Sequence, residues 1–279
     1  MNHTIYQPSM RSFAAPDPVA ARVRATWTAG DFGRIAVGYV NSAAEFVTRL
    51  GLEPNDRVLD VACGTGNLSI PAARTGASVT GIDIAPNLVI QARVRAASEG
   101  LPAVFDVGDA EELPCESGFF DATITMFGAM FAARPERAAS ELLRVTRPGG
   151  RIAMANWTPG GFVGQMLRTH LNYVPPAPGV TSPLLWGTDD GVRLRLGVGS
   201  TLALTRRMAI FEYPFPPAQV VTEFERWYGP TVRAFATLDD VAAVNLRRDL
   251  TALWEEHNRA DDGTTRVASE YLEVIAIVR

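Results

Sequence analysis

The sequence predicts an α/β fold in which a parallel sheet carries helices on both faces. Between residues 57 and 157, short apolar runs alternate with segments whose apolar residues recur at helical spacing. Strands and helices that alternate in this way are typical of doubly wound parallel sheets. Of the 279 residues, 47% are hydrophobic and 20% are charged, so the chain has enough apolar material for a sizeable core.

The elements of this alternating region follow from periodicity and from turn residues. The predicted strands cover residues 57–62, 78–83, 103–107, 120–126 and 151–157, the last after the turn Pro148-Gly149-Gly150. The predicted helices between them cover residues 67–75, 85–99 and 135–146. Before them, residues 1–17 are expected to be a loose tail, and residues 18–50 to be helical with a break at Thr28-Ala29-Gly30-Asp31.

After Trp157 the regular alternation of strands and helices ends. Residues 162–173 have helical spacing, a proline-rich loop follows, and residues 202–213 alternate as a strand does. Residues 217–258 predict two helices that break near Leu238-Asp239-Asp240, and residues 271–278 predict a terminal strand. No linker composition separates these elements from the alternating region, which favours one integrated domain.

Composition excludes several classes of protein. A net charge of −4 and a pI near 5.5 provide no basic field for nucleic acid. All 26 basic residues are Arg, which removes a Walker-type phosphate Lys and a Schiff-base Lys. Cys63 and Cys115 lack metal-ligand spacing, and the three His are scattered. Without an apolar run of signal-peptide or membrane-span length, a cytoplasmic location is expected.

The segment VLDVACGTGNLSI, residues 58–70, is the strongest local motif. Gly64 and Gly66 directly follow the first predicted strand, where ligands of parallel sheets bind. A dinucleotide fingerprint requires a third glycine where Ser69 stands, so an NAD or FAD site is disfavoured. Cys63 is a candidate nucleophile by residue type.

Five segments in order resemble the motifs of class I S-adenosylmethionine (SAM) methyltransferases. They read VLDVACGTGN, VTGIDIAP, VGDAEELP, FFDATITMFG and LLRVTRPGGRIAMANW, over about residues 55–157. The similarity is closest to the small-molecule branch of the ubiquinone/menaquinone C-methyltransferases, of the methyltransferase type 11 kind. The resemblance implies a Rossmann-like, doubly wound, mostly parallel seven-stranded sheet with an antiparallel last strand and a helical cap. It also implies a transferase that uses SAM and releases S-adenosylhomocysteine.

The resemblance divides the domain into three parts. Residues 1–50 would be a tail and helices that cover the cofactor, residues 51–157 the SAM-binding core, and residues 158–279 substrate-cap insertions with the last two strands. The expected partner is a small, apolar or aromatic acceptor, with no nucleic acid and no membrane. A nucleic-acid methyltransferase and a SAM-binding regulator without turnover remain alternatives, and a homodimer remains open beside a monomer.

The resemblance also implies the cofactor residues. The turn at Gly64 and Gly66 would give the methionine part close backbone approach, and Cys63 would be a small residue that faces this turn rather than a nucleophile. Asp83 would accept both ribose hydroxyls, although it could instead cap a helix. Trp27 and Phe32 would close the pocket, or else belong to the core. The complete predicted set is Asp60, Ala62, Gly64, Gly66, Asp83, Ile84, Asp109, Ala110, Met126, Phe127, Trp27 and Phe32.

Catalytic residues are harder to predict, because the methyl group of SAM is already activated and needs mainly alignment. A general base helps only when the attacking atom carries a proton. The candidate bases are His170, Tyr228 and Tyr173. Large aromatic residues after position 157 either line an acceptor site or build the core of the cap: Tyr173, Trp186, Trp227, Tyr228, Phe235 and Trp254.

Overall fold

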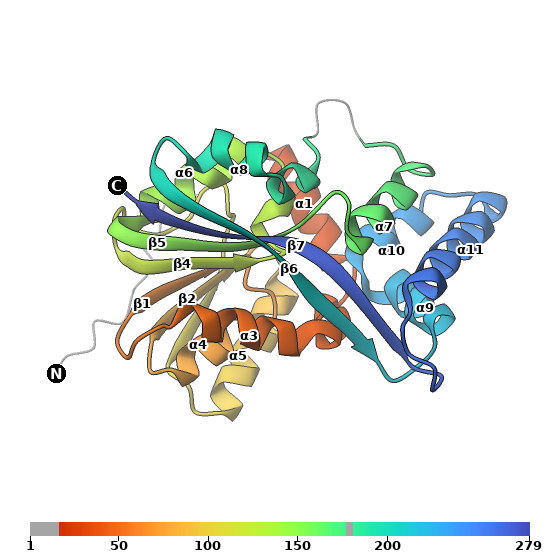
Figure 1. Cartoon of the computed structure of the whole chain (residues 1–279), viewed down its shortest axis with the longest axis horizontal. Coiled ribbons are helices and arrows are strands. Elements are labelled where there is room, and N and C mark those ends of the chain that lie inside the picture. The colour runs from red at the N-terminus through yellow and green to blue at the C-terminus, as the bar shows by residue number, and fades with distance from the viewer. Residues whose placement is uncertain (1–16, 177–180) are drawn as a thin grey trace.

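The computed structural model describes residues 17–176 and 181–279, and it contains a seven-stranded sheet between two layers of helices (Figure 1). The strand order is β3-β2-β1-β4-β5-β7-β6. Strands β1 to β5 are parallel, whereas β7 pairs antiparallel with both β5 and β6. The strands are β1 (Arg57–Val61), β2 (Ser78–Asp83), β3 (Ala103–Val107), β4 (Phe120–Met126), β5 (Thr146–Trp157), β6 (Ser200–Tyr213) and β7 (Thr265–Val278). The predicted fold class is confirmed.

Helices cover both faces of this sheet and extend beyond one end of it (Figure 1). One face carries α3 (Val40–Leu50), α4 (Ser69–Arg74) and α5 (Pro86–Ser98), and the other carries α6 (Pro135–Val145) and α8 (Asp189–Leu196). The cap consists of α7 (Phe162–Leu171), α9 (Pro217–Trp227), α10 (Gly229–Phe235) and α11 (Asp240–His257). The N-terminal segment forms α1 (Pro18–Thr28), α2 (Phe32–Ala36) and the 3-10 turn η1 (Val37–Tyr39). Two further 3-10 turns are η2 (Ala129–Phe131) and η3 (Pro183–Gly187).

Three elements differ from the sequence prediction. Strand β5 begins at Thr146, so Pro148-Gly149-Gly150 lies inside it, at the irregular start of its pairing with β4. Strand β7 begins at Thr265, because its polar first half pairs with the end of β6. The cap region 217–258 forms three helices, since Tyr228 ends α9 and Gly229 starts α10. Helix α8 and turn η3 were not predicted, and the predicted tail lies, except for Asp17, outside the described residues.

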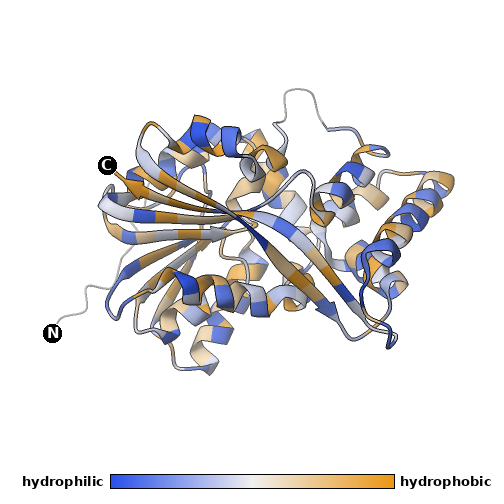
Figure 2. Cartoon of the chain, in the orientation of Figure 1, coloured by the Kyte–Doolittle hydropathy of each residue, from blue (hydrophilic) through white to orange (hydrophobic). Residues whose placement is uncertain are grey.

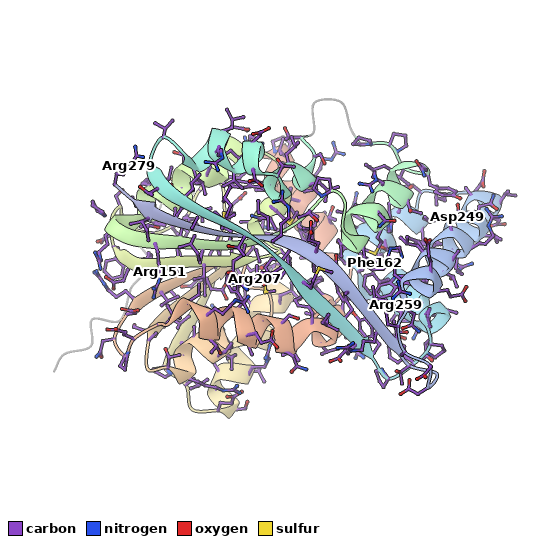
Figure 3. All side chains as sticks on the ribbon, viewed as in Figure 1. Arg151, Phe162, Arg207, Asp249, Arg259 and Arg279 are labelled. Atoms are coloured by element: carbon purple, nitrogen blue, oxygen red, sulfur yellow. The ribbon has the colours of Figure 1, made fainter. Side chains whose placement is uncertain are left out.

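The apolar core continues from the sheet into the cap. Hydrophobic residues concentrate on the strands and on the inward sides of the helices (Figure 2). Phe162 lies where the sheet meets the cap (Figure 3), with its ring centroid 4.5 Å from that of Trp254. Phe211 of β6 also contacts Trp254. Trp254 and Trp186 are both buried, so these two predicted aromatics belong to the core. No described helix is long and apolar enough to cross a membrane.

Candidate active site

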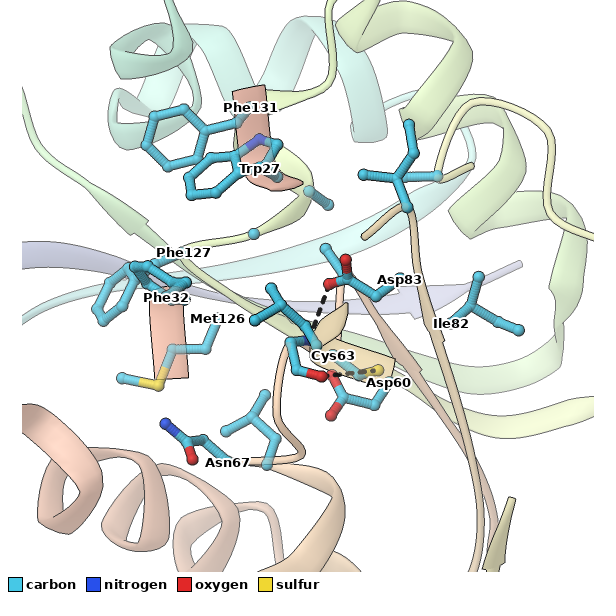
Figure 4. A pocket seen from close by; sticks show the side chains of 18 of the residues that line it. Trp27, Phe32, Asp60, Cys63, Asn67, Ile82, Asp83, Met126, Phe127 and Phe131 are labelled. Carbon is cyan, nitrogen blue, oxygen red and sulfur yellow. Dashed lines mark hydrogen bonds between the residues drawn. The ribbon is translucent and has the colours of Figure 1, made fainter. Parts of the chain in front are cut away.

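A cavity lies at the carboxyl ends of β1, β2 and β4 (Figure 4). Because β1 lies between β2 and β4, the strand order reverses here, which is where doubly wound sheets bind ligands. Eleven of the twelve predicted cofactor residues line this cavity, all except Gly66. The wall also includes residues that were not predicted, among them Tyr39, Thr65, Asn67, Glu111 and Phe131.

The loop after β1 explains why Gly66 is absent from the lining. Ala62, Gly64 and Gly66 all have positive φ angles, of 56°, 54° and 84°. A Cβ on Gly64 would meet no atom within 4 Å, so this glycine opens the wall of the cavity. A Cβ on Gly66 would come within 3.4 Å of Ile70, on the helix that follows. Gly66 therefore serves the turn and the packing of α4.

Asp83 is held in the wall by two backbone hydrogen bonds. Its Oδ2 accepts from the amide of Gly64 at 2.8 Å, and its Oδ1 accepts from the amide of Ala85 at 2.8 Å. The first bond ties the end of β2 to the glycine loop (Figure 4). Burial raises the pKa of this carboxyl. Asp83 does not occupy the N-cap of α5, which is Ala85, so it remains oriented towards the cavity.

Ser69, the residue that replaces the third glycine of a dinucleotide fingerprint, contacts a second carboxylate. Its Oγ donates to Oδ2 of Asp60 at 2.5 Å, and both residues are buried. Burial raises the pKa of Asp60 to about 7, partly offset by this hydrogen bond. Asp60 therefore changes its charge near neutral pH.

The charge of the cavity selects among ligands. Asp60, Asp83, Asp109 and Glu111 line it, and its described wall contains no Arg or His. Oδ1 of Asp109 accepts from the amide of Glu111 at 2.9 Å, which makes it a turn residue that also faces the cavity. Glu111 is ion-paired with Arg134, which does not line this wall. Asp60, Asp83 and Asp109 form no ion pair with a described residue, so they favour a cationic ligand and disfavour a pyrophosphate. The positively charged sulfonium and ammonium groups of SAM fit these carboxylates.

Aromatic side chains of the N-terminal helices cover the cavity on the side away from the carboxylates (Figure 4). The ring centroids of Trp27 and Phe32 are 5.6 Å apart, and Trp27 lies 5.3 Å from Phe131. Helix α1 has no buried residue, so it rests on the molecule without entering its core. Arg34, on α2, does not line the cavity and lies 3.6 Å from the carboxylate of Asp31.

An ion-pair bridge connects α1 to the wall of the cavity. Arg134 donates to Asp17, the N-cap residue of α1, and to Oε2 of Glu111 at 2.5 Å. Glu111 lines the cavity and is buried. This bridge, Asp17–Arg134–Glu111, therefore links the position of α1 to the cofactor wall.

A second, smaller cavity adjoins the first one beneath the cap. The two share five wall residues: Trp27, Phe32, Tyr39, Phe127 and Phe131. Its remaining wall consists of Ile35, Trp157, Val163, Met166, Phe211, Phe224 and Tyr228. No charged side chain is among these described residues, so this cavity differs chemically from the first.

The predicted bases are distributed unevenly around these cavities. Tyr228 lines the second cavity, whereas His170 and Tyr173 line neither. Nδ1 of His170 lies 2.8 Å from the carbonyl of Met166, and Nε2 lies 2.9 Å from Oγ1 of Thr231. The hydroxyl of Tyr173 donates to Asp249 on α11. Both side chains are thus engaged inside the cap.

Cys63 lines the first cavity, but its environment does not suit a nucleophile. Burial raises the pKa of its thiol, and the nearby carboxylates Asp60 and Asp83 raise it further. The thiolate is the reactive form of cysteine. The geometry therefore agrees with the interpretation of Cys63 as a small wall residue.

Comparisons with known proteins agree with the fold and the cavity. Residues 58–150 match the methyltransferase domain family. A Mycobacterium tuberculosis protein described as uncharacterised is 40% identical over 240 residues, covering 84% of this chain and 88% of that protein. The demethylmenaquinone methyltransferase of Beutenbergia cavernae is 37% identical over 139 residues, covering 48% of this chain and 55% of that enzyme.

A solved structure extends the likeness to the fold. Phosphoethanolamine N-methyltransferase 2 of Haemonchus contortus, in complex with phosphomonomethylethanolamine and S-adenosylhomocysteine, superposes with a TM-score of 0.55 at 16% identity, covering 86% of this chain and 53% of that one. The match shares the fold. The chain therefore belongs to the class I SAM-dependent methyltransferases of the small-molecule type, with S-adenosylmethionine as its cofactor.

Proposed function

We propose that this methyltransferase acts on a small, apolar or aromatic metabolite whose ring system occupies the second cavity. The observation that carries the proposal is the shared wall, since five residues line both cavities. An acceptor in the second cavity would lie next to a cofactor in the first. The uncharged, largely aromatic wall favours an apolar ring and gives no counter-charge to an ionic substrate.

The first cavity offers complementary groups for each part of the cofactor. Asp83 would accept the ribose hydroxyls, Ile84 would pack on the adenine, and Asp109 would accept from its amino group. Asp60 and the backbone at Gly64 would hold the methionine part. When bound, SAM supplies a methyl group activated by its sulfonium. Trp27, Phe32 and Phe131 would exclude water from the junction of the two cavities.

The alternatives have less support. A nucleic-acid methyltransferase would need an accessible basic surface, but the net charge is −4 and the carboxylate-lined cavity repels phosphate. A SAM-binding regulator without turnover would share the same cofactor wall. It differs only in lacking a product, so turnover has to be measured.

The test combines binding with product formation. Calorimetry should detect binding of SAM and of S-adenosylhomocysteine to the full chain, and Asp83→Asn should weaken both. A library of apolar ring compounds and hydrophilic metabolites should then be screened for release of S-adenosylhomocysteine. Release with ring compounds alone supports the proposal. Release with charged hydrophilic metabolites alone would contradict it, and cofactor binding without any release favours the regulator.

A further inference from the structure

We propose that the hydroxyls of Tyr39 and Tyr228 are hydrogen-bond donors for an oxygen of the acceptor, a ring hydroxyl or a ring carbonyl. The inference rests on the proposed function, because it assumes that the acceptor occupies the second cavity. It assigns recognition of the acceptor oxygen within the otherwise apolar second cavity, called the chamber below, to two residues from distant parts of the chain. One ends the turn η1, and the other lies between α9 and α10.

Aromatic neighbours fix the rings of both tyrosines. Tyr39 meets Phe127 and Phe211 edge to face, with centroids 5.7 and 5.6 Å away. Tyr228 lies 6.0 Å from Trp27 and 5.4 Å from Phe224. Both side chains are buried, at 6% and 4% exposure. A ring packed on several sides cannot swing its hydroxyl away, so each hydroxyl keeps a defined place.

The hydrogen-bond partners of the described tyrosines separate them into two groups. Tyr213 donates to the carbonyl of Ile35 at 2.8 Å, Tyr173 donates to Asp249, and Tyr271 accepts from Arg49 at 2.7 Å. The hydroxyls of Tyr39 and Tyr228 make no hydrogen bond with any described residue, and both residues line the second cavity. Neither hydroxyl is among the fully buried polar atoms that lack a partner, so each keeps accessible surface, and a tyrosine hydroxyl in such a place ordinarily has a partner. A ligand oxygen would supply the missing one for each.

The chemistry of the chamber fixes what these hydroxyls can do. Burial raises the pKa of both tyrosines well above the usual value, so both remain protonated at neutral pH and act as donors. Tyr228 would therefore donate to the acceptor rather than take its proton. No carboxylate, imidazole or guanidinium is among the described wall residues. A neutral oxygen on a planar ring matches this combination of two donors and apolar faces.

The contribution of the oxygen to binding can be measured with two probes of nearly equal shape, 1-naphthol and naphthalene, which differ only in a hydroxyl group. Each is titrated into the full chain in saturating S-adenosylhomocysteine, with tryptophan fluorescence as the readout. Wild type should bind 1-naphthol about 10- to 100-fold more tightly than naphthalene. Tyr39→Phe and Tyr228→Phe should each reduce this preference by about 3- to 10-fold, and naphthalene affinity should stay constant.

Tyr213→Phe is the matched control, because it removes a buried hydroxyl outside the chamber. It should lower thermal stability and leave the preference for 1-naphthol unchanged. Equal binding of both probes to wild type, binding of neither, or a preference unaltered in both Phe variants of the chamber would overturn the inference. These outcomes are distinguishable from failure of the proposed function, in which S-adenosylhomocysteine itself does not bind or no acceptor is methylated.

Discussion

The two cavities differ in how the chain builds them. The first is made mainly from loops that directly follow β1, β2 and β4, within residues 60–132, and it carries four carboxylates. The second combines α2 and η1 with β5, β6, α7 and α9, and its wall is aromatic and uncharged. In the proposed function, the end of the parallel sheet would hold the cofactor and the second cavity would hold the acceptor. Each of the following predictions tests this separation.

The largest effect is expected from Asp83→Asn, which should weaken binding of S-adenosylhomocysteine by about 100-fold. The substitution removes the charged acceptor from the wall and disturbs the bond that holds Gly64. Calorimetry measures the loss. Asp106→Asn is the control, because Asp106 lies opposite Ile82 on β3 and pairs with Arg93 away from the cavity. Similar affinities in both variants would contradict the role of Asp83.

Val163→Phe should impair the second cavity and leave the first unchanged, which is the opposite of the effect of Asp83→Asn. Val163 is buried in the wall of the second cavity and does not line the first. A larger side chain there should raise the KM for an acceptor by about tenfold or more, at a cost of roughly 1–3 kcal/mol in stability. The affinity for S-adenosylhomocysteine should not change. Val244→Phe, on an exposed face of α11, should alter neither quantity. Weaker cofactor binding in Val163→Phe would mean that the cavities are coupled.

Asp60, in the wall of the first cavity, should make the stability of the protein depend on pH. Its pKa is raised from 3.8 to about 7 by burial, so between these values the folded protein holds a proton that the unfolded chain has lost. The free energy of unfolding therefore falls as pH rises from about 4 to about 7, on the order of a few kcal/mol. Asp60→Asn should flatten this fall in thermal melts. It should also weaken binding of S-adenosylhomocysteine by about tenfold at pH 8.

Ionisation of Asp60 should also make the affinity for S-adenosylhomocysteine depend on pH. Affinity of the wild type should rise as pH increases through 7, because the ionised carboxylate attracts the ammonium group of the ligand. Asp60→Asn should lose that rise. Ser69→Ala removes the hydrogen bond from Asp60 and keeps the carboxyl, so it should move the midpoint of the rise to higher pH. A binding profile that is flat in wild type would contradict this assignment.

Arg134→Gln should have a smaller effect, because it removes only the bridge between α1 and the wall. Arg134 is about one-third exposed in both pairs, although Glu111 is buried, so we expect about a threefold loss of affinity for S-adenosylhomocysteine, which high salt should reproduce in wild type. Arg137→Gln is the control, since Arg137 is exposed one turn further along α6. Proteolysis near residues 17–28 should increase only in Arg134→Gln. Equal affinity and cleavage in the two variants would contradict a role for the bridge.

The difference between the cavities also explains what the sequence could predict. Loops that follow parallel strands converge at one sheet edge, so local motifs were sufficient to bring nine of the ten predicted residues at strand ends to one cavity. Gly66 was the exception, because spacing cannot distinguish a glycine that opens a wall from one that permits packing. The aromatic chamber depends on contacts such as Tyr39 with Phe211, which are far apart in the sequence. The break between α9 and α10 at Tyr228 was indicated in the sequence only by Gly229 and Pro230.

The same limit applies to the predicted bases, and His170→Asn should have the smallest effect on catalysis. His170 was predicted from its residue type and its place on a helix, but both ring nitrogens are engaged by Met166 and Thr231. Burial lowers its pKa, so the unfolded chain binds a proton at a higher pH than the folded protein. Stability is therefore complete above about pH 6.5 and falls as pH decreases below it.

The variant should reduce that dependence of stability on acid pH, measured by thermal melts between pH 5 and 8, because it removes the titrating ring. It should leave the pH profile of kcat unchanged once an acceptor is known, since the ring reaches neither cavity. A kcat profile that loses a limb near pH 6 in His170→Asn, but keeps it in Tyr228→Phe, would restore His170 as the base. That outcome would require the cap to rearrange when the acceptor binds, and it would join the two cavities into one mechanism.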